Sequence, residues 1–503
     1  MVTVRIHPPP AAGRRARRLL AVAASLATAL SLAVASAGVA LAANPALTRL
    51  GADPYTDTFS FHRTVVEPDI YSYGSTIVSA FQVSRVFNGG AVNVGWGTSR
   101  DGGATWRRGD LPATTTNASP PGVNGRVSDT SVVYNARDHM WLLEYLLVPS
   151  TTSNNVVNVF VSRSTDGVHW QYPIAIAKLH QFLDKPWITC DNSVKSPFYG
   201  NCYTEFEDPS VGDLIYMSTS TDGGLTWSPV QPTANHAHGL GGQPVVQPDG
   251  TVIVPINAFS NSAETISAYA STDGGQSWSA PRLVAIVQEH PSAGNIRNGG
   301  ALPSAGIDGA GHVYVTWSDC RFEPSCDAND IVLSRSSNGI IWSAPRRIPI
   351  APVGSGADYF TPGLGVDRAT SGADAHLALA YYYYPQANCT VASCQLDVGF
   401  VSSIDGGRTW SRPARLAGPM KVTWLAPTDS GYMAGDYMAT AIVGDTAYPA
   451  IIVARRPASS LLHEAAYTVA QPVTGGPVRA TTGPILARRP VRAARAALPA
   501  RNF

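Results

Sequence analysis

Hydrophobic and polar residues alternate along much of the chain in short runs that are typical of β-strands. Such runs include VNVGWGTS (residues 92–99), LIYMSTS (residues 214–220) and DVGFVSS (residues 397–403). Successive side chains of a strand point to opposite faces, so the alternation predicts strands with one face in a core. Glycine and proline together make 84 of the 503 residues, which favours turns over long helices. The pattern predicts an all-β protein.

A short motif recurs six times and follows a predicted strand each time. The copies are SRDGGATW (99–106), STDGVHW (164–170), STDGGLTW (220–227), STDGGQSW (271–278), SSNGIIW (336–342) and SIDGGRTW (403–410). The acidic position moves along the chain in steps of 65, 56, 51, 65 and 67 residues, a mean of about 61, with Asn338 in the fifth copy. A period of this size is typical of stacked supersecondary units.

Each copy has the composition of a tight turn between two antiparallel strands. A carboxylate there accepts hydrogen bonds from nearby backbone N–H groups, glycine adopts positive φ, and the tryptophan covers the turn. Two further strand-like runs precede each copy, for example 304–311 and 312–319 before the fifth. Four antiparallel strands per period, with the motif between the third and fourth, predict the blade of a β-propeller.

The motif resembles the Asp-box, or bacterial neuraminidase repeat, of sialidases and other secreted propellers. The resemblance covers roughly residues 60–470, and within that family the box is a structural turn far from the active site. It therefore implies a propeller more strongly than it implies sialidase chemistry. Sialidases have six blades, whereas the 430 residues from 43 to 472 divided by a period of about 61 predict seven. Closure of the ring is expected from pairing of residues 59–66 with the last strands of the chain.

The two ends of the chain differ from its body. Arginines at 14–18 precede an apolar, alanine-rich stretch that ends in Ala40-Leu41-Ala42, which predicts a signal peptide over 1–42, cleaved after Ala42. An uncleaved membrane anchor is the alternative. The predicted propeller occupies 57–472. Residues 473–503 lack periodicity and acids and carry six arginines, which predicts a disordered basic tail able to contact an anionic cell surface.

Charge and cysteine content limit the class of protein. The formal net charge is +1, but the five arginines of residues 1–42 and the six of residues 473–503 have no acids beside them, which leaves −10 in between. An acidic body disfavours nucleic-acid binding. Six cysteines fall into three close pairs, Cys190/Cys202, Cys320/Cys326 and Cys389/Cys394, which predict local disulfides in a secreted, extracellular protein, with reduced buried thiols as the alternative. No metal or cofactor is predicted, and a monomer is expected.

The predicted blades place polar side chains around one central mouth. In such a blade the boxes mark one face, and the starts of the first strands and the ends of the second strands meet at the other. Candidate substrate-binding residues at this mouth are Arg85, Arg126, Arg297, Asp319 and Arg321. Carboxylates, arginines and aromatic rings together suit a sugar-binding cleft, although pairing between neighbouring blades explains single residues equally well.

Sialidase chemistry makes sharper demands than sugar binding. The resemblance implies an arginine cluster for the substrate carboxylate, a tyrosine nucleophile activated by a glutamate, and an aspartate as acid/base. The nominated catalytic set is Tyr437, Glu205 and Asp69. The family's first-strand Phe/Tyr-Arg-Ile-Pro motif is absent, because that place reads VEPDI (66–70), and Arg347-Ile348-Pro349 follows the fifth box on an outer strand.

Three hypotheses about function follow. The first is a secreted, sialidase-like, exo-acting glycoside hydrolase or lyase that acts on glycans at the central mouth. The second is a non-catalytic propeller that binds a glycan or a protein there, and the third is a structural scaffold. The sequence does not decide whether the chain is an enzyme, since a fold does not fix a function.

Overall fold

The computed structural model describes residues 45–153, 155–179, 181–259, 263–459 and 461–480. These residues belong to one compact unit that begins at Pro45. Its regular elements are β-strands and four short 3₁₀ turns at Pro209–Val211, Pro324–Cys326, Gly372–Asp374 and Val422–Trp424. The prediction of an all-β protein is confirmed. The predicted signal peptide lies outside the described residues.

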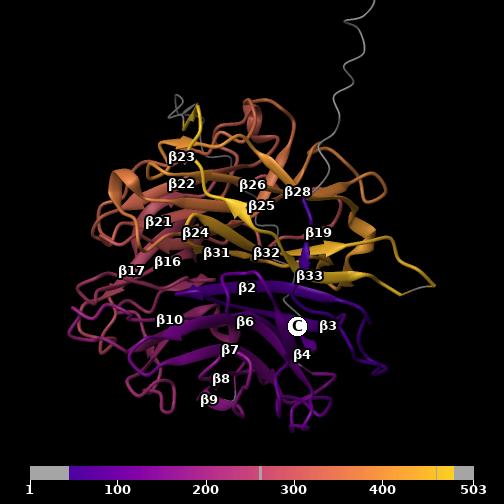
Figure 1. The fold of residues 1–503 in the computed structure, drawn as a ribbon, viewed down its shortest axis with the longest axis vertical. Helices are drawn as coiled ribbons and strands as arrows, with labels where there is room; N and C mark the ends of the chain where they lie inside the picture. The colour runs from indigo at the N-terminus through magenta and orange to yellow at the C-terminus, as the bar shows by residue number, and fades with distance from the viewer. Residues whose placement is uncertain (1–44, 154, 180, 260–262, 460, 481–503) are drawn as a thin grey trace, which may run out of the picture. The chain divides into compact units, whose positions relative to one another are not determined.

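Apart from a small sheet in which β30 (Gly431–Met433) pairs parallel with β19 (Ile296–Arg297) and antiparallel with β29 (Ala426–Thr428), the main strands follow one another as antiparallel meanders (Figure 1). The first is β2 (Val65–Tyr73), β3 (Thr76–Arg85), β4 (Ala91–Ser99) and β5 (Arg107–Asp110). The second is β6 (Arg126–Asn135), β7 (Met140–Val148), β8 (Asn158–Ser164) and β9 (Ile174–Ala177). The third is β10 (Asp184–Cys190), β11 (Cys202–Asp208), β12 (Leu214–Ser220) and β13 (Gln231–Pro232).

The later meanders repeat the same order. The fourth comprises β14 (His238–Leu240) and β15 (Val245–Val246) with β16 (Val252–Phe259), β17 (Glu264–Ser271) and β18 (Arg282–Ile286). The fifth comprises β20 (Ser304–Ile307), β21 (Val313–Asp319), β22 (Asp330–Ser336) and β23 (Arg346–Arg347), and the sixth comprises β24 (Asp358–Val366), β25 (Leu377–Tyr384), β26 (Gln395–Ser403) and β28 (Ala414–Lys421). The last comprises β31 (Ala439–Val443), β32 (Thr446–Ala454), β33 (Glu464–Thr468) and β34 (Gln471–Pro472).

The start of the chain pairs with its end, but through a different segment from the expected one. Strand β1 (Thr48–Arg49) pairs antiparallel with β33, whereas residues 65 and 66 of the predicted segment open β2. The difference arises because Val65 and Val66 continue the apolar inner edge of β2, where both are buried. Residues 48–49 therefore add a strand to the last sheet, and the predicted segment reaches β33 only through Arg63, whose carbonyl oxygen accepts the Glu464 N–H at 2.9 Å.

The motif turns have the hydrogen bonding that their composition predicts. In the third box, Asp222 Oδ1 accepts the backbone N–H groups of Leu225 and Thr226 at 3.0 and 2.9 Å. Asp222 Oδ2 accepts the Thr226 hydroxyl at 2.6 Å, and Ser220 donates to Oδ1 at 2.9 Å. In the fifth box the Asn338 carbonyl accepts the N–H groups of Ile340 and Ile341. The amide thus replaces the carboxylate in closing the turn.

Glycines of the boxes also pack against the preceding meander. A Cβ added at Gly224 would lie 2.9 Å from Leu142 of β7. In the same way Gly167 meets Val78, Gly275 meets Tyr203, Gly339 meets Ile253, Gly407 meets Leu333, and Gly103 of the first box meets Tyr448 of the last meander. A side chain at these positions would hold neighbouring sheets apart, so the box joins sheets as well as strands.

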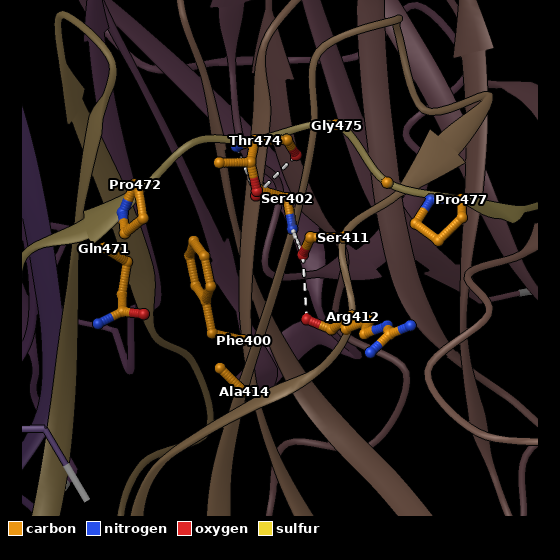
Figure 2. A pocket seen from close by; sticks show the side chains of 11 residues that line it. Phe400, Ser402, Ser411, Arg412, Ala414, Gln471, Pro472, Thr474, Gly475 and Pro477 are labelled. Carbon is orange, nitrogen blue, oxygen red and sulfur yellow. Dashed lines mark hydrogen bonds between the residues drawn. The ribbon is translucent and has the colours of Figure 1, made fainter.

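The segment after β34 bonds to the sixth meander. Strand β35 (Val478–Arg479) pairs with β27 (Thr409–Trp410) of the sixth box. Thr474 N–H donates to Ser402 Oγ, and the Ser402 hydroxyl donates to Thr474 O, both at 3.0 Å (Figure 2). We call residues 473–480 the C-terminal strap. The strap is the first part of the predicted tail (473–503), and the rest of that tail, from residue 481, lies outside the described residues.

Candidate functional site

A buried lysine lies between three carboxylates at the starts of the first strands. Lys185 Nζ is 3.2 Å from Glu67 Oε1, 3.2 Å from Asp129 Oδ1 and 3.3 Å from Asp436 Oδ2. The four residues come from β2, β6, β10 and the segment before β31, and all are almost inaccessible to solvent. We call this group, together with Arg297 and Tyr437, the axial cluster.

Arginine and glutamine side chains extend the axial cluster. Arg297 donates two hydrogen bonds from Nε to the Asp436 carboxylate at 3.0 and 3.1 Å and one from Nη2 at 2.7 Å. Gln82 donates to Glu67 Oε2, and Arg85 donates to Gln82 Oε1 at 2.8 Å. The cations and carboxylates of the axial cluster therefore pair with one another in place of water, because a buried charge is costly unless it is paired and hydrogen-bonded.

Backbone bulges aim the charged side chains into the axial cluster. Glu67, Asp129 and Lys185 have positive φ values of 54°, 30° and 49°, and each lies at a register shift between the first and second strands of its meander. Such bulges re-aim a side chain, at a cost of about 1–3 kcal/mol for a left-handed residue other than glycine. Glu67 and Lys185 each precede a proline, a signal in the sequence that would have located both bulges.

The protonation states follow from the contacts. Burial alone would lower the pKa of Lys185, but the charges of Asp129, Glu67 and Asp436 raise it above its ordinary value. Burial would raise the pKa of Asp436, but Arg297 and Lys185 hold it well below its usual range. Burial raises the pKa of Glu67. Lys185 is therefore a cation and Asp436 an anion at neutral pH.

Tyr437, the nominated nucleophile, is part of the axial cluster but is not activated. Its hydroxyl oxygen accepts the backbone N–H of Thr130 at 2.7 Å. Lys185 Nζ lies 4.6 Å from the centre of its ring, and Trp187 packs edge-on at 5.2 Å. Burial, followed by the charges of Glu67 and Asp129, raises the pKa of Tyr437 well above its ordinary value. A nucleophilic phenol needs the opposite shift.

Glu205, the nominated activator, lies in a separate group of acids. Among the described residues no hydrogen bond joins it to Tyr437, and the backbone N–H of Gly242 lies beside its carboxyl group. Burial, followed by the charges of Glu144 and Asp184, raises the pKa of Glu205 well above its ordinary value. Burial also raises the pKa of Glu144 to about 8, while Thr204 and Ser131 donate hydrogen bonds to its carboxyl group.

Asp69, the nominated acid/base, connects two sheets. Its Oδ2 accepts the backbone N–H of Val132 at 2.7 Å, which links β2 to β6. Burial raises the pKa of Asp69 to about 7. The three nominated catalytic residues are therefore buried and have separate partners, and only Tyr437 belongs to the axial cluster.

The five nominated binding residues also belong to separate groups of contacts. Arg297 is held by Asp436, and Arg126 donates to the carbonyl oxygens of Gly89, Ser150 and Ser153. Arg85 lies close enough to help lower the pKa of Arg126, which burial chiefly lowers to about 10. Asp319 and Arg321 form their own ion pair at 2.6 Å, and Trp317 Nε1 donates to Asp319 at 3.0 Å.

Glu289 is a carboxyl group that the sequence did not single out. It lies in the segment between β18 and β19 (Ile296–Arg297), and a Cβ added at Gly300 would stand 3.4 Å from its Oε2. Burial, followed by the charges of Glu264, Asp358 and Asp319, raises the pKa of Glu289 to about 8. This half-buried group is protonated near neutral pH. Its sequence neighbours are Gln288 and His290, so no local cluster of acids in the sequence indicates it.

The boxes and the axial cluster lie at opposite ends of the first strands. Glu67 stands at the start of β2, whereas Gly102 of the first box donates its N–H to Ser75 O, just beyond the end of β2. Arg347 of the displaced Arg-Ile-Pro sequence lies on the outer strand β23 and bonds Asp330 at 2.6 Å. It is therefore absent from the axial cluster.

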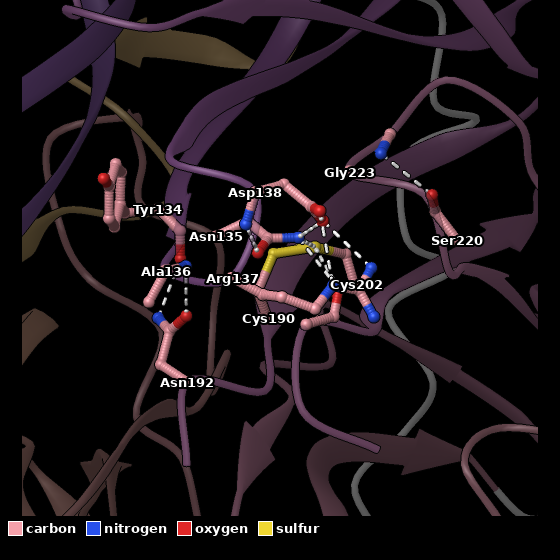
Figure 3. Close-up of a disulfide and its surroundings, with 12 residues drawn as sticks. Tyr134, Asn135, Ala136, Arg137, Asp138, Cys190, Asn192, Cys202, Ser220 and Gly223 are labelled. Carbon is pink, nitrogen blue, oxygen red and sulfur yellow. Dashed lines mark hydrogen bonds and ion pairs between the residues drawn. A yellow bond between two sulfur atoms is a disulfide. The ribbon is translucent and has the colours of Figure 1, made fainter. Parts of the chain in front are cut away.

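The predicted disulfides are present. Sulfur atoms join Cys190 to Cys202, Cys320 to Cys326 and Cys389 to Cys394. Figure 3 shows that the first bridge closes a loop fastened to the turn after β6, where Asn192 accepts the Ala136 N–H at 2.7 Å. Asn135 donates to Gly200 O at 2.8 Å on the other side of this loop.

Two further properties concern the described residues alone. Across them, no group of three or more His, Cys, Asp or Glu side chains is arranged to hold a metal ion. None of the helices in the described part of the chain is long and apolar enough to cross a membrane.

Comparison with known proteins agrees with the motif analysis. A family model described as a BNR repeat-like domain matches residues 71–293. Residues 71–293 are therefore similar to a BNR repeat-like domain, in agreement with the boxes. No curated protein sequence matches it.

Several solved structures are similar to the chain at low identity. A Hadza microbial sialidase is 14% identical over 76% of this chain and 74% of its own, with a TM-score of 0.44. An α-L-arabinofuranosidase from Fusarium graminearum, bound to an iminosugar inhibitor, is 14% identical over 71% and 98%, with a TM-score of 0.43. An ulvan lyase is 10% identical over 84% and 96%, with a TM-score of 0.46.

Proposed function

We propose that the chain is a secreted Asp-box protein whose seven meanders are the blades of a closed propeller. The support is a cycle of contacts between inner strands, in the order β2, β6, β10, β15, β20, β24, β31 and again β2. The box glycines follow the same cycle, since Gly103 of the first box packs on Tyr448 of the last meander. Three local disulfides support an oxidising, extracellular destination.

We propose further that the protein binds glycans at the face opposite the boxes and does not hydrolyse sialosides. The carrying observation is the state of Tyr437, whose hydroxyl is engaged by Thr130 and whose pKa is raised. The neighbouring Arg297 is neutralised by Asp436 and is not free for a substrate carboxylate. The half-buried Tyr432 lies on strand β30 (Gly431–Met433), which pairs with the β19 strand (Ile296–Arg297) that carries Arg297, and it supplies a stacking face for sugars.

A glycan array combined with a fluorogenic sialoside assay tests this function. We expect array signals without release of the fluorophore. Tyr432→Ala should weaken the array signals about tenfold, whereas Tyr172→Ala, at a tyrosine that is 61% exposed beyond the second box, should not. Turnover of the sialoside that disappears in Tyr437→Phe would show that the protein is a hydrolase of the sialidase type instead.

Glu289 favours a second candidate function, cleavage of a glycan other than a sialoside. A carboxyl group that is protonated near neutral pH can donate its proton to a leaving glycosidic oxygen. A panel of nitrophenyl glycosides would detect such cleavage. Glu289→Gln should then abolish turnover, while Asp374→Asn, at an exposed acid of the 3₁₀ turn Gly372–Asp374, should retain it. Equal activity in both variants would exclude Glu289 as the acid.

A further inference from the structure

A groove of about 460 Å³ lies between the sixth meander and the C-terminal strap, away from the axial cluster (Figure 2). One side is formed by β26 and the segment from Ser411 to Ala414, and the other by residues 471–477. A groove of this size falls in the range of small-ligand sites in proteins. It belongs neither to the axial cluster nor to the face proposed above for glycan binding.

The strap is a fixed wall of the groove. Thr474 and Ser402 exchange the two 3.0 Å hydrogen bonds described above, and Val473 N–H donates to Asp445 O at 2.8 Å. A Cβ added at Gly476 would lie 1.8 Å from Trp410 O, so the strap backbone lies directly on the sixth box. The groove is therefore formed before any ligand arrives, which lowers the entropic cost of binding.

The lining combines apolar surfaces with hydrogen-bonding groups. Phe400 and Ala414 lie on the sheet side, and Pro472 and Pro477 face them from the strap side (Figure 2). Gln471 and the exposed Arg412 supply polar atoms at the rim. Among the described residues, the Arg412 guanidinium has no ion-pair or hydrogen-bond partner, and no acid lines the groove.

Charge around the groove is opposite to that of the protein body. The stretch from Gln395 to Lys421 has four cationic and two acidic residues, in a body whose net charge is −10. Both acids are already engaged, because Asp405 closes the sixth box through Thr409 and Asp397 lies 3.7 Å from Arg415. A ligand that complements this region carries negative charge.

We propose that the strap groove binds a negatively charged sugar unit, a uronate or a sulfated saccharide. Its carboxylate or sulfate pairs with Arg412, its ring lies along the accessible apolar lining of Ala414 and Pro472, and its hydroxyls bond Gln471. The occupant is an anionic saccharide rather than an acidic peptide because a sugar ring matches a short, open groove with fixed walls. A peptide would need an extended run of unpaired backbone groups.

Isothermal titration of the whole protein with a chondroitin sulfate tetrasaccharide tests the site. We expect binding that weakens with added salt and that falls at least tenfold in Arg412→Gln. Arg282→Gln, at an exposed arginine on the outer strand β18, should bind like the unmodified protein. Ala414→Glu should abolish binding by placing a negative charge in the groove. Amide exchange of residues 471–477 should slow when the tetrasaccharide is added.

Three results would overturn the proposal. The first is equal weakening of tetrasaccharide binding in Arg412→Gln and Arg282→Gln. The second is equally tight binding of uncharged maltotetraose. The third is equally tight binding of tetraglutamate, which would indicate a peptide site or nonspecific attraction. Tyr432→Ala separates this site from the face opposite the boxes, because its loss of glycan-array signal should leave the tetrasaccharide titration unchanged.

Discussion

Lys185 Nζ and Glu67 Oε1 lie 3.2 Å apart although 118 residues separate them in the chain. Lys185 belongs to the third meander and Glu67 to the first, and the contact is almost closed to solvent. A buried ion pair is not strongly stabilising when compared with an apolar replacement of both partners, but the loss of one partner leaves an uncompensated charge. The axial cluster therefore specifies which strands meet more than it adds to stability.

Replacement of this lysine by an apolar side chain of similar length should destabilise the protein severely. Lys185→Met leaves Glu67, Asp129 and Asp436 without their shared cation, and such changes cost about 3–5 kcal/mol. Denaturant unfolding followed by tryptophan fluorescence measures the loss. Lys195→Met, at an exposed lysine of the Cys190–Cys202 loop, is the matched control and should change little. Equal losses in the two variants would mean that the cluster is not a buried charge network.

Removal of the Tyr437 hydroxyl should affect stability and not glycan binding. In Tyr437→Phe the buried N–H of Thr130 loses its acceptor, which costs about 1–3 kcal/mol. Tyr432→Phe, at a half-buried tyrosine without a hydrogen bond from its hydroxyl among the described residues, should cost less. Thermal unfolding of both variants gives the comparison. Unchanged stability in Tyr437→Phe would contradict the observed hydrogen bond.

Stability should decrease as pH rises toward 8, because several buried acids take up protons on folding. Burial raises the pKa of Glu144 from its ordinary 4.5 to about 8. Above pH 4.5 the unfolded chain releases this proton while the folded protein keeps it, so the contribution is largest below pH 4.5 and is lost by about pH 8. Glu144→Gln should flatten the pH dependence of unfolding between pH 5 and 8.

The matched control for this pH effect is Asp374→Asn, at an exposed acid, which should keep the original slope. An unchanged slope in Glu144→Gln would show that the carboxyl is already ionised in the folded state above pH 5. The same sign applies to Glu205, whose pKa is also raised by burial.

The sequence predicted the local features and, through the repeat, that the starts of the first strands meet, but it did not predict the pairings within the axial cluster. Each Asp-box turn depends on hydrogen bonds within a few residues, such as those of Asp222 to Leu225 and Thr226, so composition was sufficient. The partners of Lys185 come from three other segments and depend on how bulged strands meet, which no local pattern encodes. Glu205 and Tyr437 were paired in the prediction for their chemistry, whereas burial separates them into different groups.

The end of the stable domain is a second place where local composition misled. Residues 473–480 contain glycines, prolines and an arginine but no alternating pattern, which is typical of a tail. Their order depends on nonlocal partners instead, namely Ser402, Asp445 and the backbone of β27. An extended strap that bonds to an existing sheet needs no hydrophobic periodicity of its own.

Truncation at two points measures the contribution of the strap. A chain that ends after Pro472 loses the bonds to Ser402 and Asp445 and uncovers Trp410, which is fully buried. The cost should be about 2–3 kcal/mol, the scale for burial of a large side chain. Acrylamide should then quench the fluorescence of Trp410 more strongly. A chain that ends after Ala480 is the control and should unfold like the full chain; equal stability of both truncations would remove any structural role for the strap.

The first Asp box offers a test of ring closure with two adjacent glycines. Gly102 and Gly103 both have positive φ, 68° and 88°, so alanine strains the backbone at either position. A Cβ at Gly102 meets nothing within 4 Å, whereas a Cβ at Gly103 would lie 2.3 Å from the Tyr448 ring of the last meander. Tyr448 also donates its hydroxyl to Gly102 O at 2.6 Å, so this contact joins the first and last meanders.

Gly103→Ala should therefore lower the free energy of unfolding by about 1–3 kcal/mol more than Gly102→Ala, the range for overpacking a close contact. Urea unfolding of the two variants gives the difference, and a second substitution, Tyr448→Ala, should reduce it. Equal costs of the two glycine substitutions would mean that the first box does not bear on the last meander, and the closed propeller would lose its strongest support.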